Sequence, residues 1–126
     1  MRVFLAAALL AFACGCTPTP PTQSGGKPVS HWVESLRDSN DAKLRKEAAF
    51  KLGNVGPTDP ATLPALSGAL KDRDPTVRCE VILALMKFGA AARDTLPTLT
   101  EIRDHDRDPK VRSYAAKALE KLQAKE

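Results

Sequence analysis

The sequence has few of the residues from which catalytic and metal centres are built. Its 126 residues include two histidines, His31 and His105, and three cysteines. The histidines belong to no HExxH motif, and no paired cysteines accompany them to form a metal site. A glycine-rich phosphate loop, a nucleophile elbow and a reactive cysteine next to a histidine are absent too. The sequence therefore predicts a protein that is not an enzyme, with no cofactor and no bound metal.

Two residues have a chemical interpretation that we weighed against a plainer one. His105 lies between Asp104 and Asp106, where it could contact an ion, but a solvated charged turn explains this stretch better. Cys79 lies within a helical pattern, and we interpret it as a small packing residue rather than a nucleophile.

A long hydrophobic run is also missing. Residues 3–13 (VFLAAALLAFA) form an uncharged run of eleven residues after Arg2, whereas a membrane-spanning helix needs about 20. A basic start followed by a short apolar stretch is typical of a signal peptide. A buried core helix fits less well, because the run has no polar face and leads directly into CGCTPTPPTQSGGKP. We predict a signal segment over residues 1–15.

The end of this run, AFACGC, resembles the lipobox of bacterial lipoproteins, in which a cysteine follows Leu, a small residue, and Gly or Ala. Cys14 follows Ala13 and Cys16 follows Gly15, although neither has Leu three residues before it. The resemblance implies cleavage before Cys14 or Cys16, a diacylglycerol thioether on that cysteine and acylation of the new amine. Several acyl chains hold a protein firmly at a bilayer. The expected location is the bacterial cell envelope, on the outer face of the cytoplasmic membrane or in an outer membrane.

Residues 16–28 have the composition of a tether. The segment TPTPPTQSGGKP, residues 17–28, holds four prolines and two glycines among polar residues. Such a composition cannot bury a core and favours an extended, partly stiff linker. We expect this linker to separate the lipid from a domain at residues 29–126.

A strong excess of one charge is missing as well. The net charge is +4, from 19 basic and 15 acidic residues, and the basic residues are interspersed with DSND, DRD and DHDRD. Nucleic-acid binding leaves a basic patch or stripe in a sequence, and a signal segment would place the domain away from nucleic acid. We therefore expect no nucleic-acid partner.

What the sequence does contain is a repeat. DPTVR at residues 74–78 recurs as DPKVR at 108–112, and TLPAL at 62–66 recurs as TLPTL at 95–99. A shift of 33 or 34 residues aligns three segments: DAKLRKEAAFKLGNVG from Asp41, DPTVRCEVILALMKFG from Asp74 and DPKVRSYAAKALEKL from Asp108. A period of this length indicates a solenoid, in which each unit covers the apolar face of its neighbour.

Each repeated segment is expected to begin a helix. Asp74 and Asp108 suit the N-cap, and the prolines that follow them suit the first helical position, where no amide hydrogen is needed. Apolar residues then recur at spacings of three and four and share one stripe. The stripe is Val77, Val81, Leu85 and Phe88 in the second segment and Val111, Ala115, Leu119 and Leu122 in the third. A shorter helix precedes each one, so we predict three antiparallel pairs: 29–37 with 41–55, 60–71 with 75–88, and 95–104 with 109–124.

The stretch LKDRDPTVRCEVILALMKFG resembles the HEAT repeat, particularly its short bacterial form, the phycocyanobilin-lyase HEAT-like repeat. The resemblance covers residues 29–126 and rests on the DPxVR phrases, on mid-helix prolines at Pro64 and Pro97, and on small core-facing residues. It implies an all-α fold without strands: a short α-solenoid of three helical hairpins, with repeats at about 29–56, 60–89 and 95–124. The name lyase comes from relatives that attach bilins, and the repeat alone does not imply that activity.

In the HEAT family, an Asp in the turn and an Arg six residues later line up between neighbouring repeats as a hydrogen-bonded ladder. This resemblance implies a structural role for Asp72 with Arg78 and for Asp106 with Arg112. In the first repeat, Ser39 stands six residues before Arg45. A weaker ladder is therefore expected there, as suits a terminal unit.

The second helix of each pair has positions opposite the core stripe that suggest a binding surface. Phe50, Leu83, Met86 and Tyr114 should align as a row on the concave side, where solenoids usually bind partners. Phe50 and Leu83 are expected to have no neighbour within the domain. Ordinary scattered apolar residues, or cover by the tether, are the alternatives.

Together these features predict a non-catalytic, lipid-anchored scaffold of the cell envelope that presents a concave helical surface to an unidentified envelope protein. The alternative function is an accessory subunit of an enzyme complex or a lyase-like HEAT protein. Self-association through the same row, which would give a homo-oligomer, also remains open.

Overall fold

The computed structural model describes residues 23–124. These residues form a short hairpin followed by six α-helices. The elements are β1 (Gln23–Ser24), β2 (Lys27–Pro28), α1 (Val29–Asp38), α2 (Ala42–Val55), α3 (Thr62–Ala69), α4 (Pro75–Met86), α5 (Leu96–His105) and α6 (Pro109–Gln123). Two 3₁₀ helices, Gly56–Thr58 and Gly89–Thr95, connect successive pairs. The predicted all-α solenoid of three helix pairs is confirmed.

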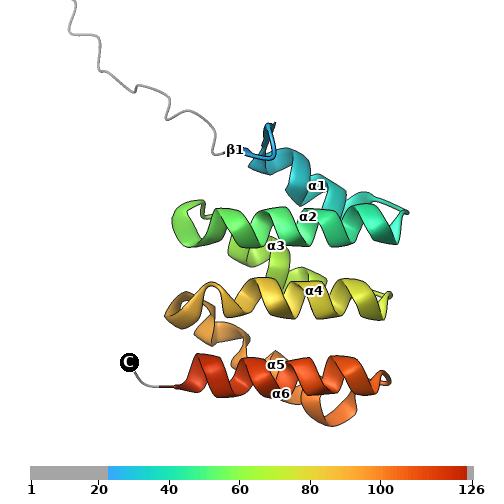
Figure 1. The fold of residues 1–126 in the computed structure, drawn as a ribbon, viewed down its shortest axis with the longest axis vertical. Coiled ribbons are helices and arrows are strands. Elements are labelled where there is room, and N and C mark those ends of the chain that lie inside the picture. Colours follow the sequence, from blue (N-terminus) through green and yellow to red (C-terminus); the bar gives the residue numbers. More distant parts are fainter. Residues whose placement is uncertain (1–22, 125–126) are drawn as a thin grey trace, which may run out of the picture.

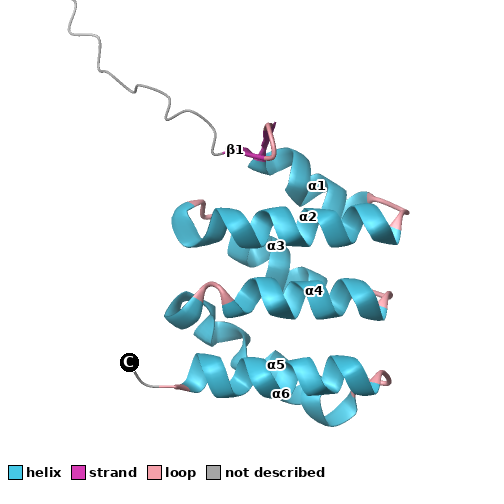
Figure 2. Cartoon of the chain, in the orientation of Figure 1, coloured by secondary structure: helices cyan, strands magenta, loops and turns pink. Residues whose placement is uncertain are grey.

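The helices are arranged in two layers. Helices α2, α4 and α6 run side by side in one layer, with α1, α3 and α5 behind them (Figure 1). The turns within the three pairs lie along one edge of this stack (Figure 2). Helix α4 packs against both α2 and α6. The second helices therefore form a continuous sheet-like layer, and one of its faces is turned away from the first helices.

Each second helix begins at an aspartate, as the sequence predicts. The carboxylate of Asp41 accepts a hydrogen bond from Lys43 N, and Asp74 and Asp108 each accept two from the amides that follow them. The hydrogen bond from the Thr76 hydroxyl and those from the backbone amides hold the pKa of Asp74 below its ordinary value. Gly56, at the end of α2, has a positive φ of 68°, which favours glycine.

The core is built from the predicted stripes. All four stripe residues of the second segment, of which Phe88 lies just beyond α4, and all four of α6 are buried. In α4 the neighbouring Ile82 and Ala84 are buried as well, because this helix has a neighbour on both sides. Burial of apolar stripes against adjacent repeats is the main stabilising contribution in such a stack.

The helix boundaries differ modestly from the prediction. Helix α3 spans Thr62–Ala69 and is shorter than the predicted 60–71, whereas α5 keeps its expected length and is displaced by one residue. Pro64 and Pro97 lie in the first turn of α3 and α5 rather than in mid-helix. A proline is tolerated there because the first amides of a helix have no intrahelical partner. No helix within residues 23–124 is long and apolar enough to cross a membrane.

Within residues 29–124 the structure contains no strand, as expected, but the predicted tether is not an extended linker at residues 23–28. There β1 and β2 form a two-stranded antiparallel hairpin. Its turn is Gly25-Gly26, both with positive φ, and a two-glycine loop is a recognised hairpin signal. The indole nitrogen of buried Trp32 donates to Ser24 O at 2.8 Å, which fixes the hairpin against α1. The signal segment and the remainder of the tether lie outside the described residues.

Helices α2 and α4 approach each other closely at Gly53. A Cβ atom placed on Gly53 would be 2.8 Å from Ala84 Cβ and 3.1 Å from Ala84 Cα. Real Cβ atoms do not approach this closely, so the two helices meet at this distance only because residue 53 has no side chain. By contrast, a Cβ atom on Gly68 of α3 would have nothing within 4 Å.

We predict that Gly53→Ala lowers the free energy of unfolding by about 1–3 kcal/mol, because α4 must move away from α2. Gly68→Ala is the matched control. It should leave stability unchanged or raise it by about 0.4–1 kcal/mol, because it removes freedom from the unfolded chain without a clash. Urea unfolding of the full chain, followed by circular dichroism, measures both, and equal stability of the two variants would contradict the close packing of α2 on α4.

Candidate interaction surface

An arginine ladder along the turn edge positions the second helices relative to one another. Arg45 on α2 donates from Nε and Nη2 to the two carboxylate oxygens of Asp72, at 2.9 and 3.1 Å. Its Nη1 donates to the backbone oxygen of Ser39 at 2.9 Å. The side chains of Arg45 and Asp72 are 4% and 9% exposed. This hydrogen bonding raises the pKa of Arg45 above its ordinary value, so the guanidinium stays charged.

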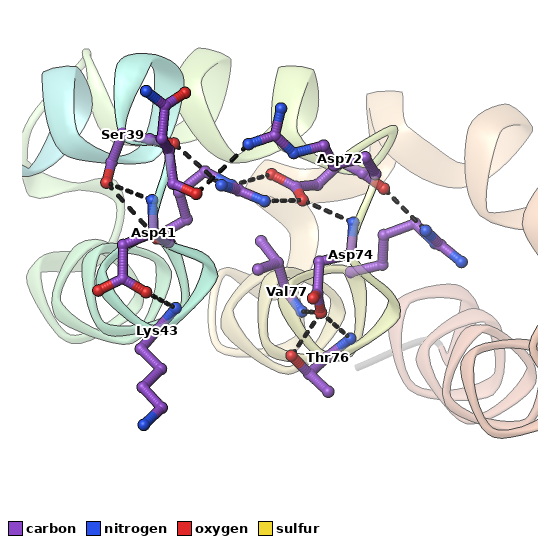
Figure 3. Close-up of polar contacts among 11 residues, drawn as sticks. Ser39, Asp41, Lys43, Asp72, Asp74, Thr76 and Val77 are labelled. Atoms are coloured by element: carbon purple, nitrogen blue, oxygen red, sulfur yellow. Dashed lines mark hydrogen bonds and ion pairs between the residues drawn. The ribbon is translucent and has the colours of Figure 1, made fainter.

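The Asp72 carboxylate accepts hydrogen bonds from two different parts of the chain (Figure 3). While it accepts from Arg45 of the preceding pair, its Oδ1 also accepts from Asp74 N at 2.9 Å. Asp74 is the N-cap of α4. One carboxylate therefore fixes the turn before α4 and ties that turn to α2.

The same geometry recurs one repeat later. Arg78 donates to both carboxylate oxygens of Asp106, at 2.9 and 3.0 Å, and to the backbone oxygen of Asp72 at 2.8 Å. Asp106 Oδ1 accepts from Asp108 N, the N-cap of α6. Arg112 completes the series with hydrogen bonds to the backbone oxygens of Asp106 and Arg107.

The expectation of a weaker ladder at the first repeat is wrong. Each arginine uses the residue six positions earlier only through its backbone oxygen. Arg45 and Arg78 take their carboxylate partner from the next repeat. Because only the backbone oxygen is used, Ser39 serves this role just as an aspartate would. Arg45 is therefore a full member of the ladder, and its position in the repeat alignment was the signal that could have revealed it.

The outward face of α2, α4 and α6 carries the four apolar residues predicted to bind a partner. Phe50 is the one large apolar residue within residues 23–124 that is exposed, at 45%. Leu83, Met86 and Tyr114 are half-buried, and Met86 and Tyr114 pack partly against the core. The row is therefore uneven, with Phe50 as its most accessible member.

Phe50 also has a neighbour that was not expected. The ammonium of Lys87 lies 5.0 Å from the centre of its ring, and Lys117 lies 5.6 Å from the ring of Tyr114 in the same way. Lys87 further donates to Asn54 Oδ1 at 2.9 Å. Both aromatic rings of this face are thus accompanied by a cation, an arrangement that is weakly attractive at exposed sites.

Two adjoining hollows open on this face. The first, of about 350 Å³, is lined by Phe50 and by charged residues of α2 and α4. The second, of about 250 Å³, lies between α4 and α6 beside Leu83 and Tyr114. Lys46 and Glu80 line both and separate them. The hairpin at residues 23–28 lines neither hollow, so this part of the expected tether does not cover the face.

Chemical alternatives find little support among the described residues. No group of three side chains from His, Cys, Asp and Glu within residues 23–124 could hold a metal ion. Next to His105, Asp104 pairs with Arg103 and Asp106 pairs with Arg78. Burial raises the pKa of the Cys79 thiol above its ordinary value, which disfavours the reactive thiolate.

A larger hollow, of about 770 Å³, opens beside the ladder between the second and third pairs. Arg78 and Asp106 line it, but their charges are already paired with each other. Asp72 and Asp108 also line it, and both accept hydrogen bonds from backbone amides at the start of a second helix. Its other charged side chains, among them Lys71, Glu101 and Arg107, are exposed and of both signs. We see no arrangement of a nucleophile and a base there.

Comparison with known proteins agrees with this architecture. Residues 29–120 match the family model of HEAT repeats. A comparison with curated proteins found no match to the chain. The match spans all three helix pairs and excludes the hairpin.

We predict that Arg45→Met lowers the free energy of unfolding by about 3–5 kcal/mol, because it leaves the carboxylate of Asp72 without its charged partner in a mostly buried site. Arg37→Met is the control, since the Arg37–Asp38 pair is exposed and contributes little. Urea unfolding of the two variants measures the difference. A loss no larger than that of the control would show that the ladder does not hold the stack together.

Proposed function

Because the chain belongs to the HEAT repeat family, whose repeats generally serve as protein-interaction scaffolds, we propose that it is a non-catalytic scaffold. It binds a partner protein through the outward face of α2, α4 and α6. The observation that carries this proposal is the exposure of Phe50 at the edge of a hollow on that face. An exposed aromatic side chain beside a hollow is a common anchor of protein interfaces.

The layered arrangement suits this role. The three second helices run side by side, so their outward positions form one surface of 14-, 12- and 15-residue helices. The ladder fixes these helices from the turn edge and takes no side chain from the outward face. A surface held rigid from its edge needs little ordering on binding, which lowers the entropic cost of association.

We further propose that the scaffold is anchored in the bacterial envelope through a lipid on Cys14 or Cys16. The support is the AFACGC sequence after a short apolar run; both cysteines lie outside the described residues. From Cys16 to β1 the chain can reach at most about 25 Å. The anchor would therefore keep the helical domain close to the membrane, where its partner would be another envelope protein.

The short bacterial type of the repeat, the phycocyanobilin-lyase HEAT-like form, remains a prediction from LKDRDPTVRCEVILALMKFG. It changes neither the proposed face nor the anchor. Turnover of a small molecule by the purified full chain would overturn the non-catalytic proposal.

Partner capture tests the proposed face. Crosslinking in the native envelope should capture a specific protein with the wild type, and Phe50→Ala combined with Leu83→Ala should abolish capture, because loss of buried anchors weakens an interface by a few kcal/mol. Val33→Ala with Leu96→Ala is the control, since both residues are half-buried and lie on the first-helix layer. Helicity of both double variants is checked by circular dichroism.

Equal capture by the wild type and the Phe50/Leu83 variant would rule out this face. Sedimentation of the full chain in detergent separates a foreign partner from self-association. A dimer that is lost in the same double variant would show that the face binds a second copy of the chain.

Metabolic labelling tests the anchor. A fatty-acid analogue should label the full-length protein and fail to label a variant in which Cys14 and Cys16 are both Ser, because the acceptor thiols are gone. Each single Cys→Ser variant then shows which cysteine carries the lipid. Persistent labelling of the double variant would place the modification elsewhere.

A further inference from the structure

The outward face of the second helices carries lysines that no carboxylate neutralises. All four ion pairs within residues 23–124 use arginine. The lysines around the two hollows are Lys43, Lys46, Lys87, Lys110 and Lys117. All five are exposed. Their charges are therefore available to an incoming molecule.

Charge is distributed unequally between the two layers. Helices α2, α4 and α6 contain nine lysines and arginines and three glutamates, and three aspartates are their N-caps, whereas α1, α3 and α5 contain two arginines and four acidic residues. Two of the arginines in the second layer, Arg45 and Arg78, are neutralised by the ladder. The remaining excess of positive charge lies on the layer that also carries Phe50, Leu83 and Tyr114.

We infer that the partner contributes an acidic segment that also carries apolar side chains, and that this segment lies across the two hollows. The inference rests on the proposed function and specifies its partner. Apolar side chains of the segment pack on Phe50 and in the hollow beside Leu83 and Tyr114. Carboxylates of the segment pair with the lysines that surround these rings. Neighbouring helices lie about 8–10 Å apart, so two anchors about that far apart would fill both hollows.

A protein segment fits this face better than an anionic lipid surface. Glu47, Glu80 and Asp108 line the hollows together with the lysines, and anionic phospholipid headgroups would repel these three carboxylates. A polypeptide can place backbone or side-chain donors opposite these glutamates and carboxylates opposite the lysines. The alternation of charge on the face therefore favours a partner with a defined sequence over a uniformly negative surface.

The experiment uses the full chain with Cys14→Ser and Cys16→Ser, so that it stays unacylated. A phage library of random linear peptides is selected against it, and the enriched peptides are measured by fluorescence anisotropy at low and high salt. The test variant adds Lys46→Gln with Lys117→Gln, two exposed positions within helices. The control variant adds Lys71→Gln with Arg93→Gln, which removes the same charge outside the face.

We expect enriched peptides to combine acidic and apolar residues. Their affinity should fall roughly three- to tenfold in the test variant and with rising salt, but little in the control variant. Failure to enrich any peptide, enrichment of basic or uncharged peptides, or equal binding to both variants would overturn the inference. Flotation with vesicles of phosphatidylglycerol and phosphatidylcholine forms a second arm. Vesicle binding that the test variant loses, without acidic-peptide binding, would overturn it in favour of a membrane surface.

Failure of this inference can be told apart from failure of the proposed function. A protein captured in the envelope through Phe50 and Leu83, but equally well by the wild type and the lysine variant, would leave the scaffold role intact. It would show that the partner is not recognised by acidic residues.

Discussion

The bidentate ion pair between an arginine of one repeat and an aspartate of the next is the constraint on which the rest of the structure depends. Arg45–Asp72 and Arg78–Asp106 have nearly the same donor–acceptor distances. Because a planar guanidinium binds a carboxylate in one orientation, each pair fixes both the separation and the rotation of successive units. A buried ion pair contributes little net stability once desolvation is counted. Its main contribution here is register, and the buried apolar stripes supply the stability.

A division between arginine and lysine follows from this ladder. Arg45 and Arg78 are bound by carboxylates along the turn edge, while the lysines of the outward face stay unpaired. Arginine suits the edge because its fork reaches a carboxylate and a backbone oxygen at once. Lysine suits an open face because its flexible stem can follow an incoming partner or rest over a ring, as Lys87 does over Phe50. The residue types thus separate the part of the chain that builds the stack from the part available for binding.

Most of the fold could be predicted from the sequence because its signals are local and repeated. Asp74 and Pro75 mark a helix start by their own chemistry, and the apolar spacing from Val77 to Phe88 marks its buried side. The hairpin was missed because Gly25 and Gly26 were interpreted by the composition of a linker rather than by hairpin geometry. The hairpin is also held against α1 by the hydrogen bond from the Trp32 indole to Ser24 O, a contact that the linker-like composition does not reveal.

The candidate site was harder to predict, because it depends on which side chains meet across repeats. Sequence spacing predicted that Phe50, Leu83, Met86 and Tyr114 share one face. It did not predict that a lysine lies over Phe50 or that the other three residues are partly buried. That face also links binding to folding. No helix pair buries its stripe alone, so a partner that spans α2, α4 and α6 binds only the assembled stack. It must therefore stabilise the stack by an amount that grows with the logarithm of the ratio of its concentration to its Kd. Because the repeats are stable only as a stack, binding of a partner to the outward face raises the free energy of unfolding of the whole domain.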